Sequence, residues 1–538
     1  MNRKPAFYLL SALLLAGGAS CNLGKEAETR TTQAQVNKVT TEQHRPQFHF
    51  TPPSKWMNDP NGMVYHKGEY HLFYQHHPGS TTWGPMHWGH AVSKDMVNWE
   101  HLPIALYPDE LGTIFSGSAV VDVNNTSGLG TKENPAMVAI YTYHSEKLEK
   151  AGRNDFQTQG MAYSLDNGRT WKKYEQNPVV KNPGIRDFRD PKVSWNEKAG
   201  QWVMTLAVLD HIEFYGSKNL KDWTKLSEFG KTAAAHGGVW ECPDLFPLTV
   251  NGQLKYVLLV SLNPGGPNKG SATQYFIGDF DGKTFKSDNP LETTFWLDYG
   301  TDNYAGVTWD NVPKSDGRRL FLGWMSNWLY ANEVPTASWR SATTVPRELT
   351  LRQTSEGVRL FSAPVKELQK LRAGTTFVKA QEVSGTLDLS NRYNLNSPLL
   401  ELDLNLDVAQ AQNVVLRFSN NKGEHLEVGY NPAQKELFID RTKAGKTDFK
   451  DTFPGRHTAP LTLENGKLRL HLLLDVASIE VFANEGKTVM TDIFFPNEDF
   501  TKVELVSTGT TRLLDSKVYK LKPASGSETA STKVSDIR

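Results

Sequence analysis

The stretch "SLDNGRTWKKY", residues 164–174, decides the fold, because the same pattern recurs along the chain. The pattern is a Ser or Gly, then an Asp or Asn, a polar turn, and an aromatic residue that opens an alternating run. Three other stretches share it: "SKDMVNWEHL" (93–102), "SKNLKDWTKL" (217–226) and "GDFDGKTFKSD" (278–288). Each copy predicts a turn between two strands. The aromatic residues lie about 50 to 70 residues apart, which suits one four-stranded propeller blade with its loops.

The rest of the sequence predicts an all-β protein with two domains, since 538 residues exceed what one hydrophobic core usually holds. Short alternating runs such as "EYHLFYQ" (69–75) recur, and a fifth unit is expected from "YAGVTWD" through "RRLFLGWMSNW" (304–328). Tryptophan is absent beyond Trp339, and some eight short strands follow that are typical of a β-sandwich. We therefore expect a five-bladed β-propeller over residues 48–350, a linker over 351–374, a C-terminal β-sandwich over 375–522 and a disordered tail over 523–538.

The N-terminus predicts export. A positively charged start is followed by the apolar stretch "AFYLLSALLLAGGAS" (6–20) and then by Cys21. Residues 1–21 resemble a bacterial lipoprotein signal, which implies lipidation of Cys21 and an anchor in a bacterial outer membrane, facing either the cell surface or the periplasm. Gly18 stands where such signals usually have Leu, so ordinary secretory cleavage is the alternative. Residues 22–47 are polar and without periodicity, which is typical of a tether.

Composition indicates a neutral partner. Lys plus Arg and Asp plus Glu both number 59, so no net charge attracts nucleic acid, and the membrane contact expected is the lipid anchor alone. The 14 Trp and 18 Tyr side chains suit a hydroxyl-rich ligand such as a sugar. Cys242 is the one other cysteine, so lipidation of Cys21 leaves no intramolecular disulfide. The sequence leaves the oligomeric state open.

Three carboxylates occur in unusual contexts: Asp59 in "WMNDPNG", Asp190 in "FRDPK" and Glu241 in "WECPDL". Each precedes a proline directly or after one residue, and proline restricts the backbone before it to extended conformations. Any one of them alone is most simply explained as a turn residue. A propeller gathers the inner strands of its blades around one funnel, however, so three carboxylates in successive blades can share a site.

The motifs "WMNDPNG", "FRDP" and "ECPDL", in this order, resemble the three signature motifs of glycoside hydrolase family 32, the β-fructosidases that include invertases, exo-inulinases and levanases. Further stretches support the resemblance: "HLFYQHHP" (71–78), "IFSGSAV" (114–120), "DYGTDNYA" (298–305) and "ASIEVFANEG" (477–486). It covers about residues 45–520 and implies a five-bladed propeller followed by a β-sandwich. It also implies retaining hydrolysis of terminal β-D-fructosyl units from levan or inulin, with sucrose as a lesser substrate.

The resemblance assigns roles to particular residues. Asp59 is expected to be the nucleophile, Glu241 the general acid and base, and Asp190 the residue that stabilises the transition state. Asn58 and backbone amides after Pro60 are expected to keep Asp59 ionised. The residues expected to bind substrate are Asn58, Gln75, Trp83, Phe115, Ser116 and Arg189. One departure from the family is Asn303, where an aromatic residue is common.

Several other functions remain open at this stage. An endo-acting levanase, an inverting hydrolase of pentose polymers, and a non-catalytic fructan-binding surface protein all fit parts of the pattern. "SLDNGRTW" also resembles the Asp-box of sialidases, but no arginine cluster is present to bind a carboxylate. Four histidines suggest a metal site, yet positions 87 and 90 fall on opposite faces of a strand, so no metal and no cofactor is predicted. They are His76, His77, His87 and His90.

Overall fold

The computed structural model describes residues 42–524. The expected signal segment with Cys21, the tether up to residue 41 and the tail from residue 525 lie outside the described residues. Within 42–524, helix is confined to four short segments: α1 (Glu146–Lys150), η1 (Lys366–Leu371), α2 (Leu389–Tyr393) and η2 (Asn484–Gly486). None of the helices in this range is long and apolar enough to cross a membrane.

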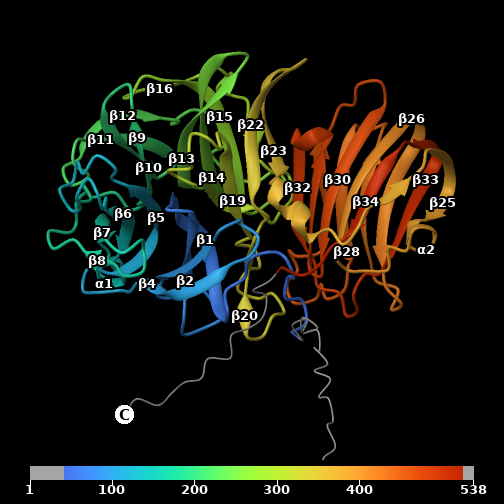
Figure 1. Ribbon diagram of the computed structural model, residues 1–538, viewed down its shortest axis with the longest axis horizontal. Coiled ribbons are helices and arrows are strands. Elements are labelled where there is room, and N and C mark those ends of the chain that lie inside the picture. Colours follow the sequence, from blue (N-terminus) through green and yellow to red (C-terminus); the bar gives the residue numbers. More distant parts are fainter. Residues whose placement is uncertain (1–41, 525–538) are drawn as a thin grey trace, which may run out of the picture. The chain divides into compact units, whose positions relative to one another are not determined.

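Five sheets, antiparallel except where β20 joins β1, form the blades of a propeller within the described residues, which confirms the predicted architecture (Figure 1). Blade 1 contains β1 (Lys55–His66), β2 (Glu69–His77), β3 (His87–Ser93), β4 (Glu100–Leu106) and β20 (Trp339–Arg340), and blade 2 contains β5 (Thr113–Val121), β6 (Met137–His144), β7 (Gln157–Ser164) and β8 (Lys172–Lys173). Blade 3 contains β9 (Phe188–Asn196), β10 (Gln201–Val208), β11 (His211–Ser217) and β12 (Thr224–Phe229). Blade 4 contains β13 (Val239–Val250), β14 (Gln253–Asn263), β15 (Ala272–Phe280), β16 (Phe285–Ser287) and β17 (Phe295–Trp296). Blade 5 contains β18 (Tyr304–Thr308), β19 (Arg319–Met325), β21 (Ala342–Thr343), β22 (Arg347–Thr354) and β23 (Gly357–Pro364).

The recurring sequence motif forms the turn between the third and fourth strands of blades 1 to 4. In blade 2 the Ser164 hydroxyl accepts a hydrogen bond from Gly168 N (2.9 Å), and the Trp171 indole donates to Gly168 O (3.0 Å). The Trp223 indole makes the same bond to Leu220 O (3.0 Å) in blade 3. Because these bonds close the turn locally, they require a hydroxyl or carboxylate before the turn and an aromatic residue after it.

The inner strands β1, β5, β9, β13 and β18 contact one another in a closed ring. Closure comes from β20, which pairs in parallel with β1 through the pairs Lys55 with Trp339 and Trp56 with Arg340. A segment that lies between two strands of blade 5 in the chain therefore completes blade 1. This places the N-terminal ends of the five inner strands around one funnel.

The C-terminal domain is a β-sandwich-like sheet, as predicted. Its strands are β24 (Thr376–Val378), β25 (Gln381–Asp388), β26 (Leu400–Ser419), β27 (His425–Asn431), β28 (Glu436–Lys443), β29 (Arg456–Pro460), β30 (Lys467–Asp475), β31 (Ser478–Ala483), β32 (Thr488–Ile493), β33 (Lys502–Leu513) and β34 (Ser516–Lys520). The long strand β26 pairs with β30 and β34 along its first half and with β27 and β33 along its second. It therefore joins both layers around one apolar core.

The two expected boundaries differ from the structure. The linker expected over 351–374 is wrong for most of its length, because residues up to 364 form β22 and β23. β22 pairs with β19, β23 pairs with β22, and the two strands complete blade 5. From the sequence, the end of the propeller is expected near the last tryptophan, Trp339. Tryptophan content, however, does not show which strands pair with one another. The tether expected over 22–47 is wrong at its end, where His44, Arg45 and Gln47 are buried and Gln47 N donates to Asp475 of the sandwich.

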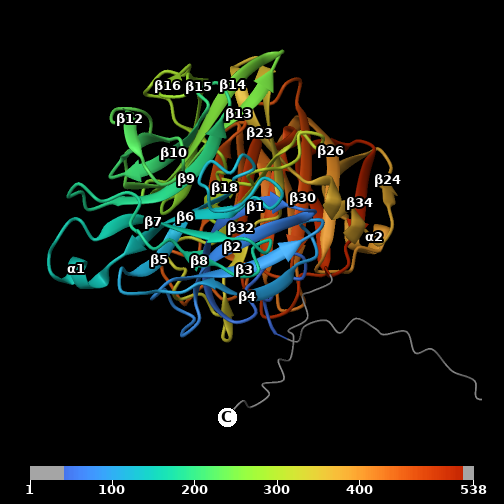
Figure 2. The same ribbon diagram turned by 60° about the vertical axis from the view of Figure 1, so that its left-hand side comes forward.

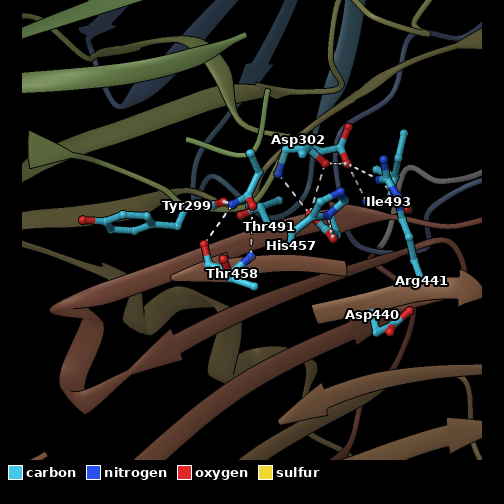
Figure 3. A network of polar contacts seen from close by, with 12 residues as sticks. Tyr299, Asp302, Asp440, Arg441, His457, Thr458, Thr491 and Ile493 are labelled. Atoms are coloured by element: carbon cyan, nitrogen blue, oxygen red, sulfur yellow. Dashed lines mark hydrogen bonds and ion pairs between the residues drawn. The ribbon is translucent and has the colours of Figure 1, made fainter. Parts of the chain in front are cut away.

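Charged side chains are paired where the propeller meets the sandwich (Figure 3). Arg441 of β28 donates to Asp302 Oδ2 (2.7 Å) and to Ile493 O (3.0 Å). Arg347 of β22 contacts both Glu480 Oε2 (2.5 Å) and Asp298 Oδ2 (3.0 Å). Buried charges of this kind are tolerated because each has opposite charges and hydrogen bonds around it.

Candidate active site

Each of the five inner strands carries a β-bulge. The pairing register shifts between Met57 and Pro60 in β1, Ile114 and Gly117 in β5, Arg189 and Lys192 in β9, Glu241 and Asp244 in β13, and Tyr304 and Val307 in β18. A bulge bends its strand and redirects side chains. Four of these bulges carry a residue that lines the same cavity. The bulges therefore account for residues of different blades meeting at one place.

Proline at three of the bulges explains the Asp-Pro and Glu-Cys-Pro patterns. Pro60, Pro191 and Pro243 lie in or directly beside them. Proline has no N–H, and a bulge is where a strand can lose a donor without breaking the ladder. Asp190 (φ 65°) and Cys242 (φ 45°) adopt the left-handed conformation there. Strain of this kind persists where the surrounding structure holds a residue in place, often for function.

A cavity of about 410 Å³ lies at the N-terminal ends of the inner strands. Its volume is in the range of small-molecule sites. All the residues that the sequence motifs assign to catalysis or substrate binding line it: Asn58, Asp59, Gln75, Trp83, Phe115, Ser116, Arg189, Asp190 and Glu241.

Asp59 is held by two side-chain donors. Ser116 Oγ donates to its Oδ2 (2.7 Å), and Asn58 Nδ2 donates to its Oδ1 (3.0 Å). The Trp56 indole in turn donates to Asn58 Oδ1 (2.7 Å), which fixes the orientation of the amide. Burial raises the pKa of Asp59 to about 6, the Ser116 and Asn58 hydrogen bonds lower it, and the nearby Glu241 raises it. Side chains thus take the place of the backbone donors that the sequence predicts after Pro60. Each of their hydrogen bonds lowers the pKa of Asp59 by less than burial raises it.

Asp190 and Cys242 lie beside Asp59. Cys242 N donates to Asp190 Oδ2 (3.1 Å), and Cys242 Sγ lies 3.6 Å from both Asp190 Oδ2 and Asp59 Oδ2. Burial raises the pKa of Asp190 to about 7, Arg189 lowers it, and the charges of Glu241 and Asp59 raise it further. Burial and the same carboxylates also raise the pKa of the Cys242 thiol, which therefore stays protonated and can donate to them.

Two side chains hold Glu241 in place: the guanidinium of Arg189 and the hydroxyl of Tyr304. Arg189 donates to Glu241 Oε1 from Nε (3.2 Å) and Nη2 (3.0 Å), and its Nη1 donates to Asp187 Oδ1 (2.5 Å). Tyr304 donates its hydroxyl proton to Glu241 Oε2. Burial alone lowers the pKa of Arg189, but the surrounding carboxylates raise it above its ordinary value, so the guanidinium remains charged. Glu241 therefore has one oxygen facing a fixed positive charge and the other facing a hydroxyl.

The cavity is closed on the side of Asp59 and open on the opposite side. Asn58, Gln75 and Ser116 are buried, with Gln75 only 2% exposed, and Gln75 Nε2 donates to Ile114 O (3.0 Å). Trp83, by contrast, is 44% exposed and packs edge-on against Phe115. The polar groups at the closed end are thus held rigidly, while an aromatic ring borders the mouth.

Seven of the residues that line the cavity were not predicted from the sequence, nor was Tyr304, which positions Glu241. The unassigned lining residues are His144, Glu149, Phe156, Gln157, Arg186, Asp187 and Trp328. Most of them come from the loop between β6 and β7 and from the residues before β9, where no motif marks them. Tyr304 lies in "DYGTDNYA", so that motif carried a signal for it. Asn303 in the same motif is buried away from the cavity and donates to Asp298 Oδ2 (3.1 Å).

The four histidines considered as metal ligands serve as hydrogen-bonding residues of blade 1. Nδ1 of His76 contacts Trp56 O (2.7 Å), and His77 and His87 contact loop carbonyls in the same way. His90 Nε2 lies 3.1 Å from His71 Nδ1. Burial lowers the pKa values of His76, His87 and His90, so these rings are neutral at pH 7.

A propeller whose central funnel holds a nucleophile-like Asp, a positioned Glu and a third carboxylate defines a glycosidase. The comparisons agree with this class. The family model "Glycosyl hydrolases family 32 N-terminal domain" matches residues 49–364, and "Glycosyl hydrolases family 32 C terminal" matches residues 367–520. The chain belongs to glycosyl hydrolase family 32.

Relatives support the assignment over most of the chain. A levanase of Bacillus subtilis (strain 168) is 50% identical over 496 residues, covering 90% of this chain and 71% of that protein. A levanase of Bacillus sp. (strain L7) is 40% identical over 85% of this chain, which spans half of that protein's length. The crystal structure of the exo-inulinase from Aspergillus awamori superposes with a TM-score of 0.82 at 36% identity, covering 90% of this chain and 99% of that one.

Proposed function

We propose that the protein is an exo-acting, retaining β-fructosidase that releases terminal fructosyl units from levan or inulin and also splits sucrose. The shape of the cavity carries this proposal. Asp59 lies among buried, hydrogen-bonded side chains at the closed end, so a fructosyl unit that reaches it must be the end of a chain. The similarity to levanases and to an exo-inulinase supports the same substrate class.

In the proposed reaction, an ionised Asp59 attacks the anomeric carbon of the terminal fructosyl unit. Glu241 transfers its proton to the glycosidic oxygen, so the bond to the leaving sugar breaks as the bond to Asp59 forms. Glu241, now a carboxylate, takes a proton from water, and the resulting hydroxide attacks the same carbon and releases Asp59. Two displacements retain the configuration of the sugar.

Four neighbouring residues assist these steps in the proposal. Asp190 hydrogen-bonds fructose hydroxyls and stabilises the transition state, since it borders the cavity beside Asp59. Arg189 and Tyr304 hold Glu241 in the orientation that proton transfer requires. The Cys242 thiol can donate a hydrogen bond to Asp59 or to Asp190, which weakens the repulsion between the two carboxylates.

A time course of products tests the function. The protein without residues 1–21 is incubated separately with levan, inulin and sucrose, beside an Asp59→Asn variant. Fructose alone from the earliest time points supports the proposal, and the better polymer identifies the natural substrate. A ladder of oligofructosides would instead show endo-action, and no release from a folded protein would favour a fructan-binding role. With methanol present, retention predicts methyl β-D-fructofuranoside as the first transfer product.

We also propose that the protein is exported and lipid-anchored through Cys21 in an outer membrane. The signal-like segment before Cys21 supports this proposal. Labelling of cells with a radioactive fatty acid tests it: the wild-type protein should carry label in the membrane fraction, and a Cys21→Ser variant should not. Label-free protein in the medium would indicate ordinary secretion.

A further inference from the structure

Seven of the sixteen residues that line the cavity have no part in the proposed reaction. Four of them come from two segments: the loop over residues 145–156, which joins β6 to β7 and carries α1, and residues 186 and 187 before β9. Hairpin loops are usually about two to five residues long, so a loop of this length invites a functional explanation. It extends well beyond the strands of its blade (Figure 2).

Side chains of these two segments form a connected polar arc with His144 at the end of β6. Arg186 Nη2 donates to Glu149 Oε1 (3.0 Å), and Glu149 Oε2 lies 3.1 Å from His144 Nε2. The His144 ring stacks on Phe115 at 4.4 Å, and the Arg186 guanidinium lies 5.3 Å from the centre of the Phe156 ring. The arc therefore runs from the aromatic wall of the fructosyl pocket to the outer rim.

The arc borders the side of the cavity where Glu241 lies. Arg189, which holds Glu241, also contacts Asp187 Oδ1 (2.5 Å) and Gln157 Oε1 (3.4 Å). In the chain, Asp187 directly follows Arg186, and Gln157 directly follows Phe156. The Arg186 side chain is 57% exposed, so the cavity opens to solvent here. A sugar joined through the bond that Glu241 protonates has to lie on this open side, because the Asp59 side is closed.

We infer that Glu149, Arg186 and Phe156 form a binding subsite for the leaving-group sugar, the neutral sugar unit that follows the scissile bond. This inference rests on the proposed function. Arg186 uses one nitrogen for Glu149, and its Nε and Nη1 have no hydrogen-bond partner among residues 42–524, so they remain available for hydroxyl groups. The ion pair fixes both groups before substrate arrives, and the Phe156 ring supplies an apolar surface for the sugar ring.

The experiment compares two leaving groups. Wild-type protein and the variants Glu149→Gln and Arg186→Met are assayed with the trisaccharide 1-kestose and with p-nitrophenyl β-D-fructofuranoside, whose leaving group has no sugar hydroxyls. The quantity measured is the kcat/KM for the trisaccharide divided by that for the aryl fructoside. Since hydrogen bonds to charged groups are involved, this ratio should fall about 10-fold or more in each variant.

A matched control comes from the same helix. Lys150 is exposed and pairs with Glu146, so Lys150→Ala should leave the ratio unchanged. A ratio within twofold of wild type in both cavity variants would overturn the inference, as would an equal loss on both substrates, which indicates a role in positioning Arg189. Wild-type protein that cleaves neither substrate would refute the proposed function itself, a result distinct from either of these.

Discussion

Replacing Asp190 by Asn should stabilise the protein at pH 8 and leave its stability unchanged at pH 4. Asp190 is 6% exposed, and its pKa is about 7 against an ordinary value of 3.8. A difference of about three pKa units corresponds to a cost of about 4 kcal/mol for keeping the buried carboxylate ionised. Asp59 shares the site, and its pKa is also raised, so the two aspartates do not titrate independently and we expect a measured gain of about 2–4 kcal/mol.

The sign follows from proton binding. Between pH 4 and pH 7 the folded protein keeps a proton on Asp190 that the unfolded chain has released, so the unfolding free energy falls as pH rises. Above about pH 7 the full cost is present. Asparagine has no charge to desolvate, tolerates the left-handed φ of 65°, and keeps an oxygen that can accept from Cys242 N.

The assay is denaturant unfolding of both proteins in steps from pH 4 to pH 8.5. The difference in unfolding free energy should be near zero at pH 4 and grow through the neutral range, while activity is lost at every pH. The control is Asp279→Asn in β15, an exposed Asp paired with Lys255, which should show no such trend. A variant that is less stable at pH 8, or equally more stable at pH 4, would refute the reasoning.

Three further predictions follow from the same geometry. The kcat/KM for sucrose should decline below about pH 6, because Asp59 with a pKa of about 6 must be ionised to attack, and a profile flat down to pH 4 would contradict this. Iodoacetamide should not alkylate Cys242 in the folded protein, because its buried thiol has a raised pKa; mass spectrometry before and after denaturation checks this. Arg347→Met should lower the unfolding free energy by about 3–5 kcal/mol in a urea titration, since it leaves Asp298 buried without its cation and leaves Glu480 with His49 alone. Exposed Arg352→Met should cost less than about 1 kcal/mol.

The propeller could be predicted from the sequence because its strongest signals are local. Trp171 and Trp223 close their turns through bonds to residues three positions earlier, so each copy of the motif is readable by itself. The strand β20 could not be predicted, because its two residues pair with Lys55 and Trp56 across most of the propeller. The linker error has the same origin: β22 is recognised as part of a blade only through its pairing with β19.

The catalytic candidates could be located for a similar reason. Asp59, Asp190 and Glu241 each stand in a short motif, whereas Glu149 and Arg186 lie in segments without any pattern and meet only in the folded chain. The electrostatics were harder to predict than the positions. The pKa of Asp59 depends on how deeply three blades enclose it, and burial is a property of the assembled funnel.

The β-bulges of the inner strands explain both where the reactive carboxylates lie and why their charges are costly to bury. A regular inner strand would pair every residue with its neighbour and point alternate side chains along the blade faces, so it could not turn a carboxylate toward the funnel axis. A bulge with proline interrupts the pairing at little cost, and the left-handed Asp190 and Cys242 then bring two carboxylates and a thiol into contact. Bringing buried like charges together in this way destabilises the fold. The Asp190→Asn experiment therefore measures how much stability the propeller gives up to hold its reactive groups in place.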